Sequence, residues 1–129
     1  MQRQASNGLP VVLCLEDDGT TVVRTLRPLY YQTALGLVVV PENFHSDGAS
    51  MPRLFWRLIG HPFQMQYLRE AILHDWLYRT QPCSRALADR IFYELLAGKV
   101  KEWRRRLIYL GLRLGGWIAW RQNRKELIK

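Results

Sequence analysis

His74, Asp75 and Tyr78 are the residues whose types and spacing best suit chemistry. They fall in a stretch with helical periodicity, where residues three or four apart are surface neighbours, so Tyr78 lies beside both His74 and Asp75. His74 and Asp75 themselves point about 100° apart on a helix. This difference in direction suits two separate tasks, because an imidazole nitrogen can take a proton from water while the Asp75 carboxylate, aimed elsewhere, holds a divalent cation.

Asp89 is the residue that we expect to orient His74. A catalytic base needs a fixed tautomer, and a carboxylate on a facing helix provides it by accepting from the other ring nitrogen. The two helical stretches are joined by a short connection at Pro82, which predicts antiparallel neighbours with Asp89 at the height of His74. Two interpretations stay open: a catalytic site, or a satisfied polar cluster that locks two helices together.

Asp47 is a second candidate ligand for the cation. It stands in the loop that precedes the helices, beside Gly48, which lets the backbone approach a ligand closely. Turn and N-cap chemistry by Asp47 and Ser50, just before Pro52, is the stronger explanation from the residues alone. The isolated histidines His45 and His61 are predicted to be surface or turn residues.

The elements that must position these residues begin with strands. Residues 11–15 and 20–26 are β-prone runs separated by a segment with an Asp-Gly step, which predicts a hairpin. Residues 35–40 read as a third strand, stopped by Pro41. Together these runs predict a small antiparallel sheet within residues 1–43.

Helical periodicity then extends over residues 50–120. Ser50 and Ser84 are expected N-caps, Gly98 is an expected stop, and Gly115-Gly116 interrupts the last helix. The predicted helices cover residues 52–59, 64–79, 84–97 and 101–120. The fold class is therefore α+β, a small antiparallel sheet packed on a three- to four-helix C-terminal half, in a single domain over residues 1–129 that ends in a basic tail, 121–129.

The net charge of +8 is concentrated at the end of the chain. Residues 1–98 hold equal numbers of basic and acidic residues, whereas residues 99–129 hold ten basic residues and two acidic ones. An excess of this kind predicts an anionic partner, either a phospholipid surface or an acidic protein. Nucleic acid is the weaker expectation, because no recognised reading motif accompanies the charge.

The helix after Lys101 is the expected partner-binding element, through Arg104, Arg105, Arg106 and Arg113. Residues 107–120 are too short to span a membrane but are suited to lying at its interface, with Trp103, Trp117 and Trp120 near the headgroups. The alternative is that the apolar residues of this segment pack on the other helices while the arginines are solvated.

Composition limits the class of protein further. Only two cysteines are present, too few for a disulfide framework, and they form no zinc-like spacing with the histidines. The first residues lack the charged and apolar regions of a secretory signal, and no run approaches 18 apolar residues. We therefore expect a location in a host cytoplasm or a phage virion, with no secretion signal and no transmembrane segment.

Several of these motifs together resemble a known family, the domain-of-unknown-function family 1353. The resemblance covers roughly residues 35–120 and implies a bacteriophage or prophage protein, because that family looks widespread in tailed phages and prophages. It rests on the following motifs: Val40-Pro41, Phe44, Ser46-Asp47-Gly48-Ala49-Ser50-Met51-Pro52-Arg53, Ala71-Ile72-Leu73-His74-Asp75-Trp76-Leu77-Tyr78, Ala88-Asp89-Arg90-Ile91-Phe92, and Arg106 through Tyr109 and Arg113 to Gly116-Trp117.

A second, local resemblance concerns the helix pair of phospholipase A2 enzymes. It implies that His74 is the general base on water and that Asp75 is a calcium ligand. It also implies that Asp89 orients His74 and forms a hydrogen bond with Tyr78. The chain departs from that pattern because the Gly-rich calcium loop and the cysteine staples are absent and the helix connection is shorter. Asp47 with Gly48 would have to replace the calcium loop.

Two main functions follow from these observations. One is a hydrolase, in which His74 and Asp89 form a base dyad, Tyr78 supports it, and Asp75 with Asp47 holds Ca2+ or another divalent cation. Its expected substrate is an ester or phosphoester of a membrane or cell-envelope molecule. The other is a non-enzymatic virion, assembly or host-interaction protein, whose basic C-terminal helix binds an acidic partner.

Overall fold

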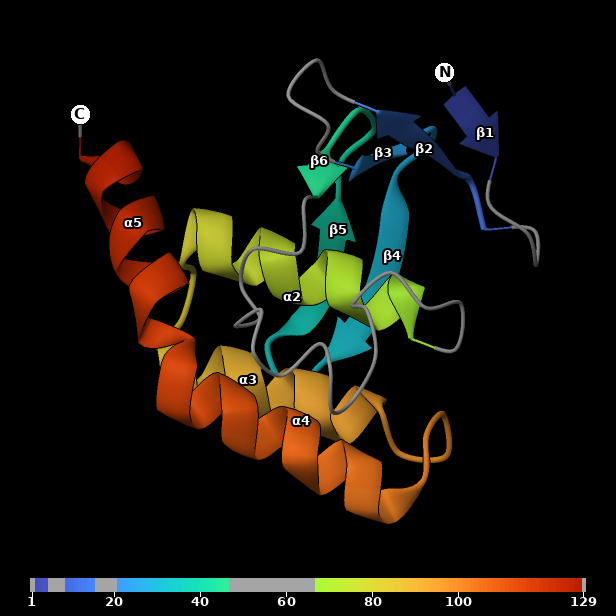
Figure 1. The fold of residues 1–129 in the computed structure, drawn as a ribbon. Coiled ribbons are helices and arrows are strands. Elements are labelled where there is room, and N and C mark those ends of the chain that lie inside the picture. Colours follow the sequence, from blue (N-terminus) through green and yellow to red (C-terminus); the bar gives the residue numbers. More distant parts are fainter. Residues whose placement is uncertain (1, 5–8, 16–20, 47–66, 129) are drawn as a thin grey trace. The chain divides into compact units, whose positions relative to one another are not determined.

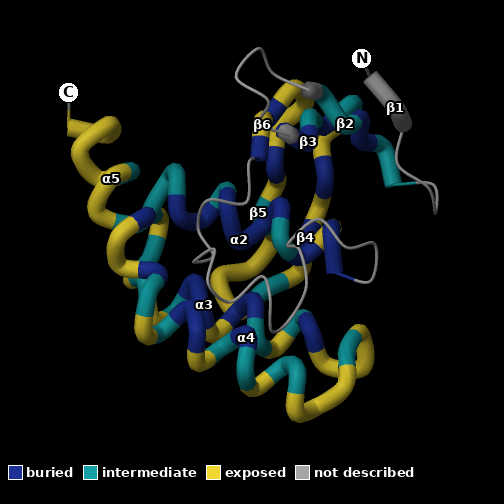
Figure 2. The backbone as a smooth tube through the Cα atoms, viewed as in Figure 1, coloured by how far each residue is buried: buried dark blue, intermediate teal, exposed yellow. Residues whose placement is uncertain are grey.

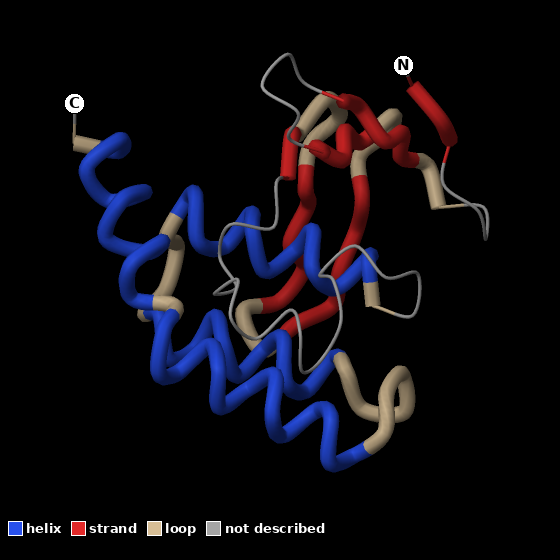
Figure 3. Tube along the Cα trace, in the orientation of Figure 1, coloured by secondary structure: helices blue, strands red, loops and turns tan. Residues whose placement is uncertain are grey.

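Strands come first and helices follow in the computed structural model, which describes residues 2–4, 9–15, 21–46 and 67–128. The chain forms two compact units, Met1–Asp47 and Gly48–Lys129. Figure 3 shows the described strands in the first unit and the described helices in the second. The α+β class is confirmed, and the assignment of all 129 residues to one domain stays a prediction.

A four-stranded antiparallel sheet is the larger of the two sheets in the first unit (Figure 1). The hairpin expected at its centre is confirmed, with Val11 opposite Thr25 and Leu13 opposite Val23. Val11 and Val23 are fully buried, as β-branched side chains on the inner face of a pleated sheet often are. In spatial order the strands are β1 (Gln2–Gln4), β2 (Val11–Leu15), β3 (Thr21–Thr25) and β6 (His45–Ser46).

The third expected strand does not join this sheet, so the prediction of one sheet was wrong. Strand β5 (Gly36–Val40) pairs with β4 (Leu29–Thr33) in a separate two-stranded antiparallel sheet. Strand β4 alternates buried and exposed side chains from Leu29 onward, which is the pattern of a half-buried strand. The short connection between the two strands makes them a local hairpin.

Helix α2 (Leu68–Thr80) has the most buried residues of the described helices in the second unit. It begins inside the predicted range and is followed by the C-cap residue Gln81. The backbone of Gln81 is left-handed (φ 50°), and its N–H donates a hydrogen bond to the Leu77 carbonyl oxygen. Figure 2 shows buried residues along most of this helix. Its polar side chains therefore need partners inside the protein.

Helix α3 (Arg85–Leu95) starts at the N-cap that was expected. The Ser84 side chain accepts a hydrogen bond from the Leu87 N–H, which satisfies one of the free donors of the first turn. The helix ends near the stop signal, and Gly98 has a backbone φ of 78°, which glycine adopts without steric cost. Helices α2 and α3 are separated by four residues and pack as antiparallel neighbours.

Two helices replace the single interrupted helix at the end of the chain. Helix α4 (Glu102–Gly115) packs against α3, and α5 (Trp117–Leu127) packs against α2. The break falls at Gly116, as predicted, and α5 carries the helix well into the segment treated as a basic tail. The short helix expected over residues 52–59 lies outside the described residues.

The core of the helical unit joins α2, α3 and α4. Tyr67, Phe92, Leu96, Ile108 and Leu112 form one buried cluster between them. In the described residues, no helix combines the length and the apolar character needed to cross a membrane.

Candidate functional site

His74 and Asp89 meet between α2 and α3. His74 Nε2 lies 2.9 Å from Asp89 Oδ1, and both side chains are buried. The contact forms because the short connection makes the two helices antiparallel and sets His74 and Asp89 at the same height. The expected contact between these residues is confirmed.

Tyr78 completes this side of the carboxylate. Its hydroxyl donates to Asp89 Oδ1 over 2.7 Å, and its ring lies 4.4 Å from the His74 ring between centroids. Burial and the nearby Asp89 charge raise the pKa of Tyr78 well above its usual range, so the hydroxyl stays a donor. Tyr78 thereby fixes the position of Asp89 from one turn beyond His74 on α2.

Two arginines bind the other oxygen of the same carboxylate. Arg113 Nη1 of α4 donates to Asp89 Oδ2 over 2.9 Å, and Arg85 Nη1 of α3 donates to it over 3.4 Å. Arg85 also donates to the carbonyl oxygens of Leu112 and Arg113, at the end of α4, where a cation is favoured by the helix dipole. Asp89 therefore holds α2, α3 and α4 together.

The charge of Asp89 is stabilised by these contacts. Burial by itself would raise the pKa of the carboxyl, but the hydrogen bonds from His74, Tyr78 and Arg113 outweigh it and hold the pKa below its usual range. Asp89 is therefore an ionised acceptor at neutral pH. Since a carboxylate only accepts, His74 Nε2 carries the proton, and the lone pair of the neutral imidazole is on Nδ1.

The two predicted cation ligands are not brought together in the described structure. Asp75 lies on α2 and is buried, whereas Asp47 lies outside the described residues. Across the described parts of the chain, no three His, Cys, Asp or Glu side chains gather as a metal site would require. Of the two predicted ligands the described residues include only Asp75, and the predicted cation stays a prediction.

Glu70 is a polar residue of this helix face that the sequence reasoning missed. It lies one turn before His74 on α2 and is buried, and its Oε2 atom has no hydrogen-bond partner among the described residues. Its other oxygen, Oε1, lies 3.8 Å from Nζ of Lys99. Burial raises the pKa of Glu70, against the opposing effect of Lys99. The four-residue spacing of Glu70, His74 and Tyr78 was the signal that could have identified it.

Gly116 was predicted as a helix interruption but has a further role beside the site. A Cβ atom there would overlap the Tyr78 hydroxyl and the Leu112 carbonyl oxygen. Next to it, Trp120 meets the Tyr78 ring edge-on, with 5.1 Å between centroids, and its carbonyl oxygen accepts from Gln81. The break between α4 and α5 thus lets the chain pass close to Tyr78.

The four arginines expected to bind a partner differ in their surroundings. Arg113 contacts Asp89, and Arg105 donates to the Tyr93 carbonyl oxygen and to Glu102, with its guanidinium over the Tyr93 ring. Arg106 is mostly exposed and lies 3.5 Å from Glu102 Oε1, while Arg104 is partly buried. Their role toward a partner stays a prediction.

Comparisons with known proteins identify relatives of unassigned function. The chain is 36% identical over 73 residues to the uncharacterized protein y4jT of Sinorhizobium fredii (strain NBRC 101917 / NGR234), covering 54% of this chain and 21% of that protein. It is 31% identical over 65 residues to the uncharacterized protein y4iH of the same strain, covering 50% of this chain and 27% of that protein. The chain thus spans about a quarter of these relatives or less.

No solved structure matches the chain. The model of the family described as "Protein of unknown function (DUF1353)" matches residues 23–112, which include β4, β5, His74, Tyr78 and Asp89. Because this match covers more than half of the 129 residues, the chain belongs to the DUF1353 family.

Proposed function

We propose that this protein is a hydrolase whose general base is His74. The observation that carries the proposal is the 2.9 Å contact between His74 Nε2 and Asp89, a carboxylate that is itself held by Tyr78 and Arg113. A base needs an imidazole with a fixed tautomer and a neighbouring negative charge that stabilises the protonated ring. Asp89 fixes the tautomer of His74 and supplies the negative charge.

The reaction that suits this arrangement is hydrolysis of an ester. His74 Nδ1 takes a proton from water as the water oxygen attacks the ester carbonyl carbon. The tetrahedral intermediate then expels the alcohol oxygen, which receives the proton from the imidazolium. Asp89 offsets the positive charge of His74 between these steps.

The substrate we propose is an ester of a membrane or cell-envelope molecule, hydrolysed in the manner of phospholipase A2 and in a phage or prophage setting. The arrangement of His74, Tyr78 and Asp89 agrees with what the local resemblance to that helix pair implies. Asp75 and Asp47 are the residues proposed to hold Ca2+ or another divalent cation, which would polarise the ester carbonyl.

The test is fatty-acid release from anionic phospholipid vesicles by the purified chain, with calcium and with a chelator. The informative variant is His74→Gln, because a glutamine amide can still donate to Asp89 but cannot act as a base. We expect release to fall by roughly 10²–10⁴-fold with little change in melting temperature. Release that persists in folded His74→Gln would refute the proposed role of His74.

A second candidate function is non-enzymatic, as a virion, assembly or host-interaction protein. It is favoured by the deep burial of the dyad, since His74 is 3% exposed and Asp89 is 0% exposed. In this case the cluster of His74, Tyr78 and Asp89 only stabilises the helices. We then expect His74→Ala to lower the melting temperature. We also expect the wild type to hydrolyse no ester in a panel of phospholipids.

A further inference from the structure

An exposed apolar stripe runs along α4, on a side separate from the dyad. Trp103, Leu110 and Leu114 are seven and then four residues apart, which places them within roughly 40° of one another around the helix. Each is about half exposed or more, and Leu114 reaches 63%. Side chains of this size that share one line on a helix form a continuous apolar surface.

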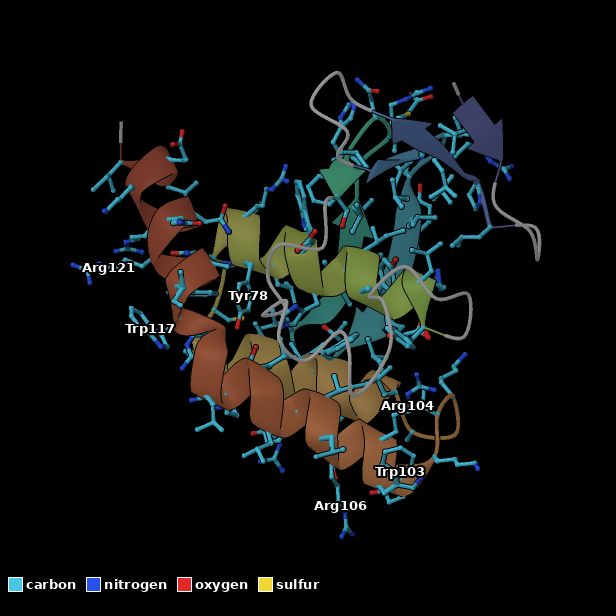
Figure 4. All side chains as sticks on the ribbon, viewed as in Figure 1. Tyr78, Trp103, Arg104, Arg106, Trp117 and Arg121 are labelled. Carbon is cyan, nitrogen blue, oxygen red and sulfur yellow. The ribbon has the colours of Figure 1, made fainter. Side chains whose placement is uncertain are left out.

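Two further large apolar side chains are exposed at the junction with α5. Trp117 and Ile118 are about half exposed there, directly after Gly116. In Figure 4 the side chains of Trp117 and Arg121 point outward from the start of α5, and that of Arg106 points outward from α4. Tryptophan is enriched where a protein meets the interface of a membrane, because its ring is apolar and its N–H is polar.

Positive charge borders the stripe. Arg106 is 73% exposed and lies about 60° from the line of Trp103 around α4. The segment 99–129 as a whole carries ten basic residues against two acidic ones. Apolar side chains flanked by cations are complementary to a surface that is negative outside and apolar beneath, which is an anionic phospholipid bilayer.

A cavity of about 410 Å³ lies between α3 and α4 and shares Arg106 with the border of the stripe. Arg90 and the side chains of Tyr93 and Tyr109 line it as well, and Glu94, 3.3 Å from Arg90, is the acidic residue among the described residues of the lining. Guanidinium and phenol groups donate hydrogen bonds to phosphate oxygens, so the cavity has the size and chemistry to receive a lipid headgroup.

We infer that this surface of α4 and the start of α5 binds anionic membranes, with the apolar stripe in the interface and a headgroup phosphate beside Arg106. Membrane binding itself does not rest on the proposed function. Only the further step, in which the bound membrane supplies an ester to His74, rests on it. An acidic protein would suit the charge equally, but the protruding tryptophans and leucines favour a lipid interface.

The experiment is co-sedimentation of the full chain with vesicles of equal parts phosphatidylcholine and phosphatidylglycerol, and with phosphatidylcholine alone. Binding is expected to the anionic vesicles and to weaken with salt. Leu114→Glu and Arg106→Glu should each weaken it by roughly tenfold or more. The matched controls are Leu37→Glu on β5, where Leu37 is 59% exposed, and Arg27→Glu, which make the same charge changes at exposed residues of the first unit.

Equal binding to both vesicle types, no binding, or equal losses in the control variants would overturn the inference. Binding to a duplex DNA fragment that needs Arg106 but tolerates Leu114→Glu would overturn it in favour of nucleic acid. His74→Gln separates this inference from the proposed function, since it should bind vesicles normally. Binding without fatty-acid release refutes the hydrolase alone, and release from a water-soluble ester without vesicle binding refutes the surface alone.

Discussion

Arg113 Nη1 lies 2.9 Å from Asp89 Oδ2, which joins α4 to the centre of the site formed by α2 and α3. An arginine that sequence reasoning reserved for an external anion thus has a carboxylate within its own chain. With Arg85 it places two guanidinium groups on one buried oxygen, while the other oxygen serves His74 and Tyr78. Asp89 consequently contacts His74, Tyr78, Arg85 and Arg113, which come from three helices.

Asp89→Asn should therefore destabilise the helical unit strongly. Removing one partner of a buried ionic cluster leaves the arginines uncompensated, which costs about 3–5 kcal/mol of the free energy of unfolding. Denaturant unfolding measures this cost. The matched control is Glu94→Gln, which removes the exposed pair with Arg90 and should cost less than about 1 kcal/mol. Similar costs for the two variants would contradict the central role of Asp89.

Acidification should remove the contribution of Asp89 to the free energy of unfolding. Its folded pKa lies below its unfolded value of about 3.9, so its stabilisation is present above that unfolded value and is lost as pH falls through the folded pKa. The difference in unfolding free energy between the wild type and Asp89→Asn should thus be constant near neutral pH and shrink in acid. A difference that stays constant down to the lowest accessible pH would exclude this titration.

Glu70 should behave in the opposite sense. Its folded pKa is raised by burial, so its contribution to stability is fully present below the unfolded value of about 4.3 and is lost as pH rises through the folded pKa. Glu70→Gln, which cannot ionise, is expected to raise the unfolding free energy at neutral pH by on the order of 1 kcal/mol. The difference in unfolding free energy between Glu70→Gln and the wild type should vanish in acid. A Glu70→Gln variant that is less stable than the wild type at neutral pH would show instead that the ionised carboxylate is needed.

Gly116→Ala should disturb the hydroxyl of Tyr78. The added methyl group overlaps that hydroxyl and the Leu112 carbonyl oxygen, and such overpacking costs about 1–3 kcal/mol. A double-mutant cycle with Tyr78→Phe tests the cause, because removal of the hydroxyl should make the glycine substitution less costly. Strictly additive costs would mean that only the backbone contact matters.

The His74–Asp89 contact was predictable because its determinants are local. Helical spacing and a short connection fix the relative heights of two antiparallel helices, so residues 15 apart in sequence meet. The Ser84 cap and the break at Gly116 were predictable for the same reason, since each depends on a few adjacent residues.

The rest depended on contacts between distant elements. Arg113 lies on α4, 24 residues beyond Asp89 in sequence. Nothing in the spacing of Arg113 distinguishes it from the solvated arginines nearby. The pairing of β5 with β4 was missed because residues 29–33 were not predicted as a strand, and because periodicity identifies a strand without naming its neighbour. Glu70 was missed because a lone glutamate on a helix is usually solvated, and its burial follows from packing on several sides of α2.

Arg113 and Leu114 are consecutive, so their side chains leave α4 about 100° apart, one toward Asp89 and the other toward solvent. The register of the last turn of α4 is therefore fixed by the contact of Arg113 with Asp89, and it sets which side chain is exposed. Inserting or deleting one residue before Arg113 would turn both side chains by about 100°, so neither assignment could be kept. Length changes should be tolerated at the exposed turn of residues 97–98 and not within the helix, which makes α4 a poor place for a tag or a fusion and that turn a better one.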